Sequence, residues 1–276
     1  MKQRIHDVRE KVKMKNPLIH CITNPISINQ CANVILAVGG KPIMAEHPGE
    51  VRDITGTSEA LLLNLGNITD VRMESMLISA KEARDKEIPI VLDAVGAACS
   101  ALRRAFVWKI LDVTVPTVIK GNYSEINALG NALYWSKGVD VDDSLDVNNV
   151  EKVAVTLAKK MGTTILASGK QDIITDGEVL IKVNNGTPRL SAVTGTGCML
   201  GALCAAYLSS GTGIEAALSS CAVLGISGEL VSAEKGNGMF QVCLMDSIST
   251  LEDADIETYL DLEKPSKMIL KDLAYE

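Results

Sequence analysis

The amino-acid sequence predicts an α/β fold in which a mostly parallel central sheet is covered by helices on both faces. Short apolar runs bounded by turn residues alternate with longer segments of helical period, as in repeated strand–helix units. The apolar runs are continuous rather than alternating, which is typical of strands buried on both faces. The 276 residues contain no linker, repeat or low-complexity segment, so we expect a single domain over residues 1–276.

The predicted strands are short apolar segments that end in polar or glycine-containing turns. Five belong to the parallel part of the sheet: Leu18–Ile22, Ala60–Leu65, Ile88–Asp93, Thr117–Ile119 and Thr163–Ala167. After Ser168 the rhythm changes, and two further strands follow: Asp172–Thr175 and Val179–Val183. They are joined by Asp176-Gly177, a strong hairpin signal, so the sheet is expected to have a short hairpin edge.

Segments of helical period separate these strands. Val71–Lys86 and Val150–Lys160 are two examples, and Asn148 or Asn149 is a candidate N-cap for the second. From Cys198 to Lys235 the chain is predicted to be almost wholly helical. The order of strands and helices therefore follows the repeated pattern of a parallel sheet.

Composition limits the classes of partner. The net charge of −7 and the pI of about 5.1 argue against nucleic acid or an anionic membrane as the main partner, while a local basic pocket for phosphates stays compatible with them. The apolar stretches Cys198–Leu208 and Ile214–Val231 are interrupted by Ser, Gly or Glu, which predicts buried helices rather than membrane spans. Seven cysteines without a C-x-x-C pair, behind a charged N-terminal segment, indicate free thiols in a reducing cytoplasm.

The residues that follow the predicted strands are the first candidates for a functional site, because ligands of such sheets bind beyond the carboxyl ends of the strands. These segments are unusually polar and rich in glycine: His20–Asn24, Asn64–Asn67, Asp93–Gly96, Lys120–Glu125 and Ser168–Lys170. Asp93, an acid at a strand end beside small residues, suits a metal or phosphate site. The alternative is a carboxylate that only caps the loop.

The stretch TGTGCMLG, residues 194–201, predicts an anion hole for a transferring phosphoryl group. A helix that begins near Cys198 would add the positive end of its dipole to converging backbone N–H groups. Four small residues form the loop: Thr194, Gly195, Thr196 and Gly197. The alternative is a plain helix start that is capped by Thr194 or Thr196. No G-K-[ST] follows, so the stretch is not a Walker A loop.

The segment IKGNYSE, residues 119–125, carries a second candidate site. Lys120 could meet a nucleotide phosphate as it leaves its strand. Asn122 and Glu125 would share one face at the first turn of a helix and could hold a hydrated magnesium ion, which needs few direct protein ligands. The alternative, which the spacing alone favours, is an N-cap Asn with a capping-box Glu.

Cys198 is compatible with three roles: an activated nucleophile, a proton acceptor or a buried apolar residue. The chain has three histidines, and none of them forms a pair with metal-ligand spacing, which argues against a zinc enzyme. A dyad of Cys198 with His20 would indicate a cysteine hydrolase, although no local pattern supports it. Other cysteines on apolar helices, such as Cys204 and Cys221, are expected to be inert core residues.

Six motifs that follow one another over nearly the whole chain resemble those of one family. They are PLIHCITNPISINQCANVILAVGGKPIM (Pro17–Met44), LNLGNIT (Leu63–Thr69), VLDAVGA (Val91–Ala97), IKGNYSEI (Ile119–Ile126), VTGTGCMLGA (Val193–Ala202) and KGNGMFQ (Lys235–Gln241). Together they resemble the hydroxyethylthiazole kinases, thiamin-salvage enzymes of the ribokinase-like superfamily. The resemblance implies a three-layer ribokinase-like fold and ATP- and Mg²⁺-dependent phosphorylation of the hydroxyl of 4-methyl-5-(2-hydroxyethyl)thiazole.

The resemblance also implies roles for individual residues. The residues that match Met44 and Gly195 contact the thiazole, and those that match Lys120 and Ser168 bind ATP. Family members form homotrimers with the thiazole pocket between neighbouring subunits, so Met44 would serve a site completed by another chain. Two alternatives stay open: a ribokinase-like kinase for another small alcohol, such as a hydroxymethylpyrimidine, and a non-catalytic thiazole- or nucleotide-binding protein.

The acids that match Asp93 and Glu125 lie near the metal and the phosphates in the family. The loop after the aspartate departs from the usual DPVGxG-like run, because Ala94 follows Asp93 and Cys99 falls near the second glycine. This departure makes the loop less rigid and weakens the prediction of a metal contact there.

The position that matches Cys198 is commonly Asp in the wider superfamily, where it accepts the proton of the substrate hydroxyl, and thiazole kinases with either residue are known. A thiol at a helix N-terminus is partly thiolate near neutral pH. Phosphoryl transfer through a loose transition state depends mainly on positioning and charge neutralisation and asks little of a base. The resemblance therefore favours Cys198 as a dispensable proton acceptor.

Overall fold

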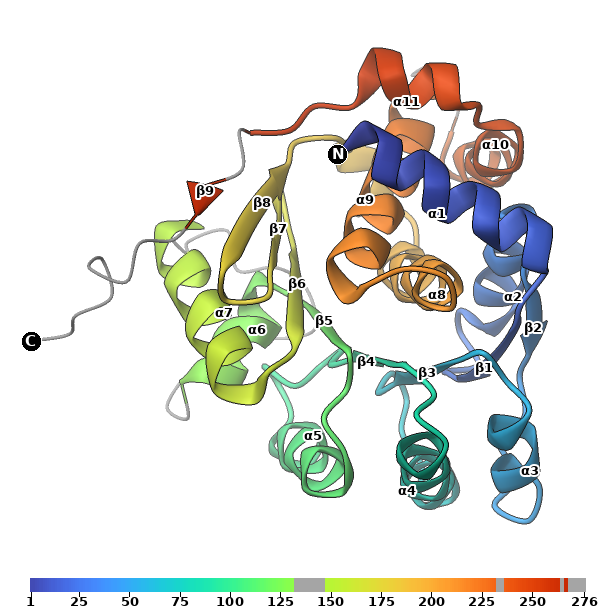
Figure 1. The fold of residues 1–276 in the computed structure, drawn as a ribbon, viewed down its shortest axis with the longest axis vertical. Helices are drawn as coiled ribbons and strands as arrows, with labels where there is room; N and C mark the ends of the chain where they lie inside the picture. Colours follow the sequence, from blue (N-terminus) through green and yellow to red (C-terminus); the bar gives the residue numbers. More distant parts are fainter. Residues whose placement is uncertain (132–146, 232–235, 264–265, 268–276) are drawn as a thin grey trace, which may run out of the picture.

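The computed structural model describes residues 1–131, 147–231, 236–263 and 266–267. Within them one sheet is flanked by helices on both faces, as the continuous apolar runs predict (Figure 1). The three-layer α/β architecture expected from the sequence is confirmed. Lys235, which begins KGNGMFQ and ends the long segment predicted to be helical, lies outside the described residues.

The described strands follow the order β2-β1-β3-β4-β5-β6-β7-β8-β9 across the sheet. Neighbouring strands from β2 to β6 are parallel, and β7, β8 and β9 continue the sheet with antiparallel pairs. The strands are β1 (Leu18–Ile22), β2 (Lys41–Ile43), β3 (Ala60–Asn64), β4 (Ile90–Asp93), β5 (Val118–Asn122), β6 (Thr164–Ser168), β7 (Asp172–Thr175), β8 (Val179–Val183) and β9 (Ser266–Lys267).

The predicted strands are all present, and β1, β7 and β8 have the predicted bounds. The sequence pattern missed β2 and β9, because strands of three and two residues are too short to form an apolar run. The predicted hairpin is confirmed. The Asp176 carboxylate accepts hydrogen bonds from the N–H groups of Glu178 and Val179, and Gly177 takes the left-handed conformation, with φ at 94°.

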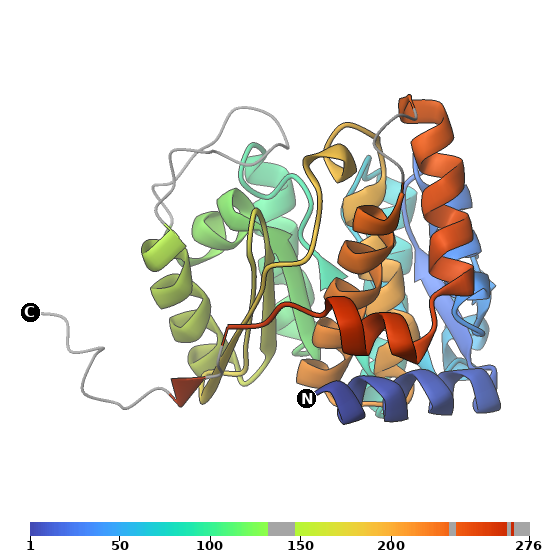
Figure 2. The ribbon, with the colours of Figure 1, turned by 90° about the horizontal axis from the view of Figure 1, so that it is seen from above.

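The helices form one layer on each side of the sheet (Figures 1 and 2). One layer contains α3 to α7, and the other contains α1, α2 and α8 to α11. The helices are α1 (Lys2–Lys15), α2 (Ile28–Ala37), α3 (Val51–Gly56), α4 (Asp70–Asp85), α5 (Ala101–Val113), α6 (Tyr123–Gly130), α7 (Val147–Met161), α8 (Thr196–Leu208), α9 (Gly213–Leu230), α10 (Asn237–Thr250) and α11 (Asp253–Tyr259).

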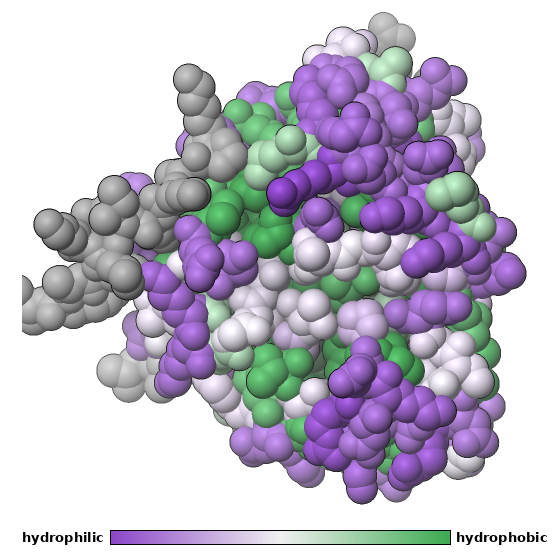
Figure 3. Space-filling view, in the orientation of Figure 1, coloured by the Kyte–Doolittle hydropathy of each residue, from purple (hydrophilic) through white to green (hydrophobic). Residues whose placement is uncertain are grey.

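Two hydrophobic cores, one on each face, explain why the strands are apolar throughout. In β3, Leu62 packs into the core under α8 and α9, while Leu61 and Leu63 face the core under α4 and α5. Successive side chains of a strand point to opposite faces, so a sheet covered on both sides needs apolar residues at every position. Hydrophilic side chains gather instead over α1 and α4 on the outer surface (Figure 3).

Helices α8 and α9 are apolar on all sides because they lie inside the fold. By length and hydropathy α9 is the described helix that would be able to cross a membrane, but 78% of it is buried within the protein. This confirms the prediction of buried helices. The predicted N-cap of α7 is wrong: the helix already includes Val147, so Asn148 and Asn149 lie in its first turn.

Gly225 in α9 allows this helix to touch the loop that follows β8. A Cβ atom at Gly225 would lie 2.6 Å from the carbonyl oxygen of Asn185 and 2.8 Å from the Asn185 Cβ. One turn further along, the Glu229 carboxylate accepts hydrogen bonds from the Gly186 N–H and the Asn185 side chain. These contacts fix the start of the segment that leads to the loop before α8.

We expect Gly225→Ala to lower the free energy of unfolding by about 2 kcal/mol, because the added methyl group must displace backbone atoms of Asn185. Gly238→Ala in α10 is the matched control. Nothing lies within 4 Å of its added Cβ, and alanine favours helix, so a change of about 0 to 1 kcal/mol toward greater stability is expected. Urea denaturation measures both, and equal effects would contradict the close approach.

Candidate active site

Polar side chains line the carboxyl ends of neighbouring parallel strands. In the register of the sheet, Asn64 at the end of β3 lies opposite Asp93 at the end of β4, and Asp93 lies opposite Lys120 in β5. Asn122 at the end of β5 lies opposite Ser168 at the end of β6. Neighbouring strands are about 4.8 Å apart, so these side chains are within reach of one another. The predicted convergence of the strand exits is confirmed for this row.

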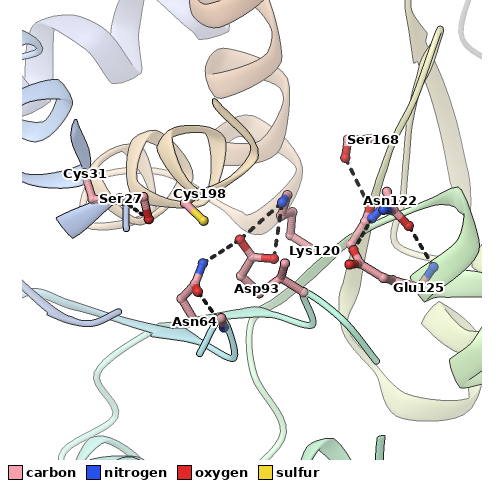
Figure 4. Close-up of polar contacts among 12 residues, drawn as sticks. Ser27, Cys31, Asn64, Asp93, Lys120, Asn122, Glu125, Ser168 and Cys198 are labelled. Atoms are coloured by element: carbon pink, nitrogen blue, oxygen red, sulfur yellow. Dashed lines mark hydrogen bonds and ion pairs between the residues drawn. The ribbon is translucent and has the colours of Figure 1, made fainter. Parts of the chain in front are cut away.

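Asp93 and Lys120 form a buried ion pair at the centre of the row (Figure 4). The Lys120 Nζ lies 3.2 Å from each carboxylate oxygen of Asp93, and Asn64 Nδ2 donates to Asp93 Oδ2 at 2.9 Å. Burial lowers the pKa of Lys120, but the carboxylates of Asp93 and Glu125 outweigh it and raise the pKa above its usual value. Burial raises the pKa of Asp93, and the ammonium of Lys120 opposes this shift. The ammonium therefore stays charged.

Glu125 is held by two backbone N–H groups. Its Oε2 accepts from the Asn122 N–H at 2.7 Å, and its Oε1 accepts from the Gly96 N–H at 2.7 Å. Asn122 Oδ1 in turn accepts from the Glu125 N–H at 2.9 Å, which completes a capping box. The capping interpretation is thus confirmed for this pair. Burial raises the pKa of Glu125 to about 7, although Lys120 opposes the shift.

The loop after Asp93 is well anchored despite lacking the proline of the family pattern. The Ala94 N–H donates to the Lys120 carbonyl at 2.8 Å, a bond that proline would not be able to form. Gly96 takes a left-handed conformation with φ at 79°, and the Cys99 N–H donates to its carbonyl at 3.3 Å. These bonds counter the expectation that the loop is less rigid.

The loop before α8 has the backbone geometry of an anion-binding helix start. Gly195 is the N-cap residue, with φ at 95°, so the alternative in which Thr194 or Thr196 caps the helix is wrong. The Thr196 hydroxyl instead donates to the Leu190 carbonyl at 2.7 Å. The first N–H groups of an α-helix have no intrahelical acceptor and attract anions.

Lys120 lies directly under this loop. A Cβ atom at Gly197 would be 3.4 Å from the Lys120 Nζ, so the absence of a side chain leaves the ammonium next to the first turn of α8. Gly195 packs against Ser27, where an added Cβ would meet the Ser27 Cβ at 3.2 Å. The small residues thus bring a buried cation and the backbone N–H groups of a helix start together, which is a strong arrangement for a phosphoryl group.

Cys198 is half-buried in the first turn of α8, beside the ion pair (Figure 4). Its Sγ lies 3.4 Å from Asn24 Nδ2. The dyad with His20 is excluded, because both imidazole nitrogens are engaged elsewhere: Nε2 with the Ala45 carbonyl at 2.9 Å and Nδ1 with the Thr55 hydroxyl at 2.8 Å. Burial lowers the pKa of His20.

Met44 and Ser168 lie toward opposite ends of the row. Met44 follows β2, which is the edge strand next to β1, and its half-buried side chain packs against the core under α8. Ser168 ends β6, where its hydroxyl donates to the Gly121 carbonyl at 3.4 Å. The structure therefore gathers Asp93, Lys120 and the first turn of α8 at the centre and leaves these two residues at the flanks.

Asn24 and Asn64 are part of this cluster, although sequence reasoning gave neither of them a role. Both fall within the polar strand exits, and this position was the available signal. In the described residues, no group of three or more His, Cys, Asp or Glu side chains is arranged to hold a metal ion. Asp93 and Glu125 thus provide at most two carboxylate ligands, which suits a cation that keeps most of its water.

Comparison with known proteins identifies close relatives of the chain. A sequence model of the hydroxyethylthiazole kinase family matches residues 9–254. Hydroxyethylthiazole kinase 2 of Clostridium botulinum (strain Kyoto / Type A2) is 47% identical over 253 residues, which cover 89% of this chain and 95% of the relative. Hydroxyethylthiazole kinase of Alkaliphilus oremlandii is 38% identical over 262 residues, covering 93% and 96%.

Solved structures show the same fold. A hydroxyethylthiazole kinase protein from Pyrococcus horikoshii has a TM-score of 0.87 and 30% identity, with 97% of this chain and 100% of that chain covered. Pyridoxal kinase from Staphylococcus aureus in complex with ADP has a TM-score of 0.64 at 13% identity, covering 91% and 98%. The second likeness shows the ribokinase-like fold alone.

We expect Lys120→Met to lower the free energy of unfolding by about 3 kcal/mol, because it leaves the buried Asp93 carboxylate without its counter-ion. Adding Asp93→Asn should recover part of this loss. Lys86→Met is the control. It removes an exposed ammonium from Glu82, which keeps Arg52 as a partner, and should cost less than about 0.5 kcal/mol. Urea denaturation gives the three values. Similar losses for the two lysines would contradict the role of the buried pair.

Proposed function

The chain belongs to the hydroxyethylthiazole kinase family and phosphorylates the hydroxyl of 4-methyl-5-(2-hydroxyethyl)thiazole, and we propose that the polar row at the strand ends carries out this transfer. The observation that carries the proposal is the buried ammonium of Lys120 next to the first turn of α8. Together they supply fixed positive charge where a transferring phosphoryl group carries negative charge.

We assign the ATP side of the site to Lys120, Ser168 and the loop before α8. The four loop residues act as the anion hole through their backbone: Thr194, Gly195, Thr196 and Gly197. Lys120 faces the phosphates, while Ser168 lies two strands from Asp93, toward the hairpin edge of the sheet. ATP would thus run along the carboxyl edge with its terminal phosphate over the centre of the row.

Asp93 and Glu125 are the residues that would hold Mg²⁺. Their donor chemistry fits: both are buried carboxylates, and each Glu125 oxygen accepts one backbone N–H while keeping a lone pair for a water molecule of a hydrated ion. When bound, the metal would neutralise charge on the phosphates. The Lys120 ammonium already neutralises the charge of the Asp93 carboxylate. Of the two carboxylates, Glu125 is therefore the one without an ion-pair partner of its own among the described residues.

The thiazole side is assigned to Met44, Gly195 and Cys198. The substrate hydroxyl oxygen attacks the γ-phosphorus of ATP, its new O–P bond forms as the bond to the bridging oxygen breaks, and ADP leaves. The hydroxyl proton passes to Cys198 Sγ, which lies in the first turn of α8 beside the anion hole. Because the transition state is loose, this proton transfer contributes less than the positioning of the two substrates.

The wider setting of the site is also part of the proposal. Met44 lies near the edge of the sheet, on the strand side away from ATP, which suits a pocket completed by a neighbouring subunit of a homotrimer. The acidic chain, its free thiols and the kinase family suit a cytoplasmic enzyme of thiamin salvage whose partners are ATP and the thiazole alcohol.

ATP-dependent phosphorylation tests the proposal directly. With Mg²⁺ present, the thiazole alcohol should be phosphorylated at least about 100-fold more efficiently, by kcat/KM, than a hydroxymethylpyrimidine or a sugar alcohol. Both of these alcohols carry polar groups that a site built for the thiazole would leave without hydrogen-bond partners. Mass spectrometry of the product and coupled ADP release provide the measurement. Preference for the pyrimidine would reassign the substrate, and ATP-independent consumption of an ester with sensitivity to iodoacetamide would indicate a hydrolase.

Variants of Cys198 test its role as proton acceptor. Cys198→Asp should retain or raise kcat, because a carboxylate also accepts the proton, and Cys198→Ala should lower kcat by roughly 100-fold or less without abolishing it. Steady-state kinetics at saturating ATP measure both variants. An inactive alanine variant, together with a covalent adduct on the wild-type thiol, would indicate nucleophilic catalysis instead.

A further inference from the structure

Asn24, which follows β1 and is 4% exposed, has an amide whose orientation is fixed by its surroundings. Its Oδ1 lies 3.1 Å from both the Ile26 N–H and the Ser27 N–H. Backbone N–H groups only donate, so the atom that faces them must be the amide oxygen. The NH₂ group of Asn24 therefore points the other way, into the cluster.

That NH₂ group has two partners. Asn24 Nδ2 lies 3.1 Å from Asn64 Oδ1 and 3.4 Å from Cys198 Sγ. The Asn64 amide is fixed in the same manner, because its Oδ1 also accepts from the Gly66 N–H at 2.9 Å, and its Nδ2 donates to Asp93 Oδ2 at 2.9 Å. Asn24 and Asn64, which we name the amide relay, thus connect Cys198 with Asp93.

Gly66 shows how closely the amide relay is packed. A Cβ atom at Gly66 would lie 2.5 Å from Asn24 Nδ2 and 2.9 Å from Asn64 Oδ1, so any side chain there would displace both amides. Asn64 is completely buried. Two buried amides whose four polar ends all have partners form a rigid unit, since each displacement would leave a buried group unsatisfied.

We propose that Asn24 is a positioning residue for phosphoryl transfer that acts through Cys198. An amide NH₂ donates and never accepts, so the sulfur of Cys198 is the acceptor in this contact. Donation to the sulfur occupies one of its lone pairs and holds it in a fixed place relative to Asp93 and Lys120. This inference rests on the proposed role of Cys198 as the acceptor of the substrate hydroxyl proton.

The contact of Asn24 with the turn that follows it does not require the NH₂ group. The turn at Ile26 and Ser27 uses only the oxygen of Asn24, and an Asp or a Ser side chain supports such turns as well. The NH₂ group of the amide donates to Asn64 Oδ1 and to Cys198 Sγ. This division allows the two functions of Asn24 to be separated by substitution.

The experiment uses Asn24→Ser, which retains a hydroxyl for the turn without reaching Cys198, and Asn24→Asp, which retains the acceptor oxygen and removes the donor. Asn29→Asp, an exposed position in α2, is the matched charge control. Each Asn24 variant is made in the wild type and in Cys198→Ala. Thermal melting verifies folding, steady-state kinetics give kcat and KM, and mass spectrometry follows alkylation of Cys198 by iodoacetamide at pH 7.

We expect both Asn24 variants to lower kcat by about 10-fold with KM for the thiazole changed less than about twofold, because a hydrogen bond to a charged acceptor is lost. In the Cys198→Ala background, Asn24→Ser should change kcat by less than about threefold, since the residue it acts through is absent. Alkylation of Cys198 should slow by about fivefold in both variants, because iodoacetamide reacts with the thiolate. Asn29→Asp should match the wild type in every measurement.

Two results would overturn the proposal. One is an equal loss of kcat for Asn24→Ser in the presence and absence of Cys198, which would mean that Asn24 acts on the fold or on another group. The other is an unchanged alkylation rate in both Asn24 variants. If the wild type phosphorylates no thiazole alcohol, the proposed function fails, and the alkylation rates still decide whether Asn24 acts on the sulfur.

Discussion

The buried ion pair of Asp93 and Lys120 is the interaction on which the site depends. Removing two charges from water costs several kcal/mol per ion, and the cost is recovered only when further polar groups complete their surroundings. Asn64 supplies one such group to Asp93, and Glu125 adds a second carboxylate near the ammonium, which helps to raise the pKa of Lys120. The polar row is therefore a condition for burying the pair as well as a place for chemistry.

The parallel sheet provides this surrounding through the register of its strands. Its register places one polar residue on each neighbouring strand end, and the loops after β4 and before α8 are shaped by glycines with positive φ, Gly96 and Gly195. Two helix starts then complete the arrangement. The start of α6 is closed by its own capping box through Glu125, whereas the start of α8 has no side-chain cap. The second start is therefore the one that we propose binds the anion.

Much of the fold was predictable because its signals are local. Continuous apolar runs predict the parallel strands, and Asp176-Gly177 predicts the hairpin. The polar strand exits predict the edge of the sheet at which the candidate site lies. The strands β2 and β9 were missed, since pairing with a neighbour rather than any apolar run defines a strand of two or three residues. The sequence also left open a threonine cap for α8, which the structure excludes because a glycine with positive φ occupies the N-cap position.

Within the site, residue types and spacing identified Asp93, Lys120 and Glu125 as candidates, but their mutual contacts depend on strand order, which is a property of the whole sheet. Asn24 and Asn64 are 40 residues apart, and only the adjacency of β1 and β3 joins them. The same limit applies to the roles of Met44, Ser168 and Cys198, which stay predictions from family resemblance combined with their positions at the strand ends.

The orientation of the Asn24 amide has a consequence for how this site can change in evolution. A donor that is locked by its own backbone contacts places a simple demand on residue 198, namely that its side chain accept a hydrogen bond. Sulfur and carboxylate oxygen both meet that demand. A single substitution between cysteine and aspartate therefore preserves the acceptor of this hydrogen bond, so Asn24 itself would not have to change with it.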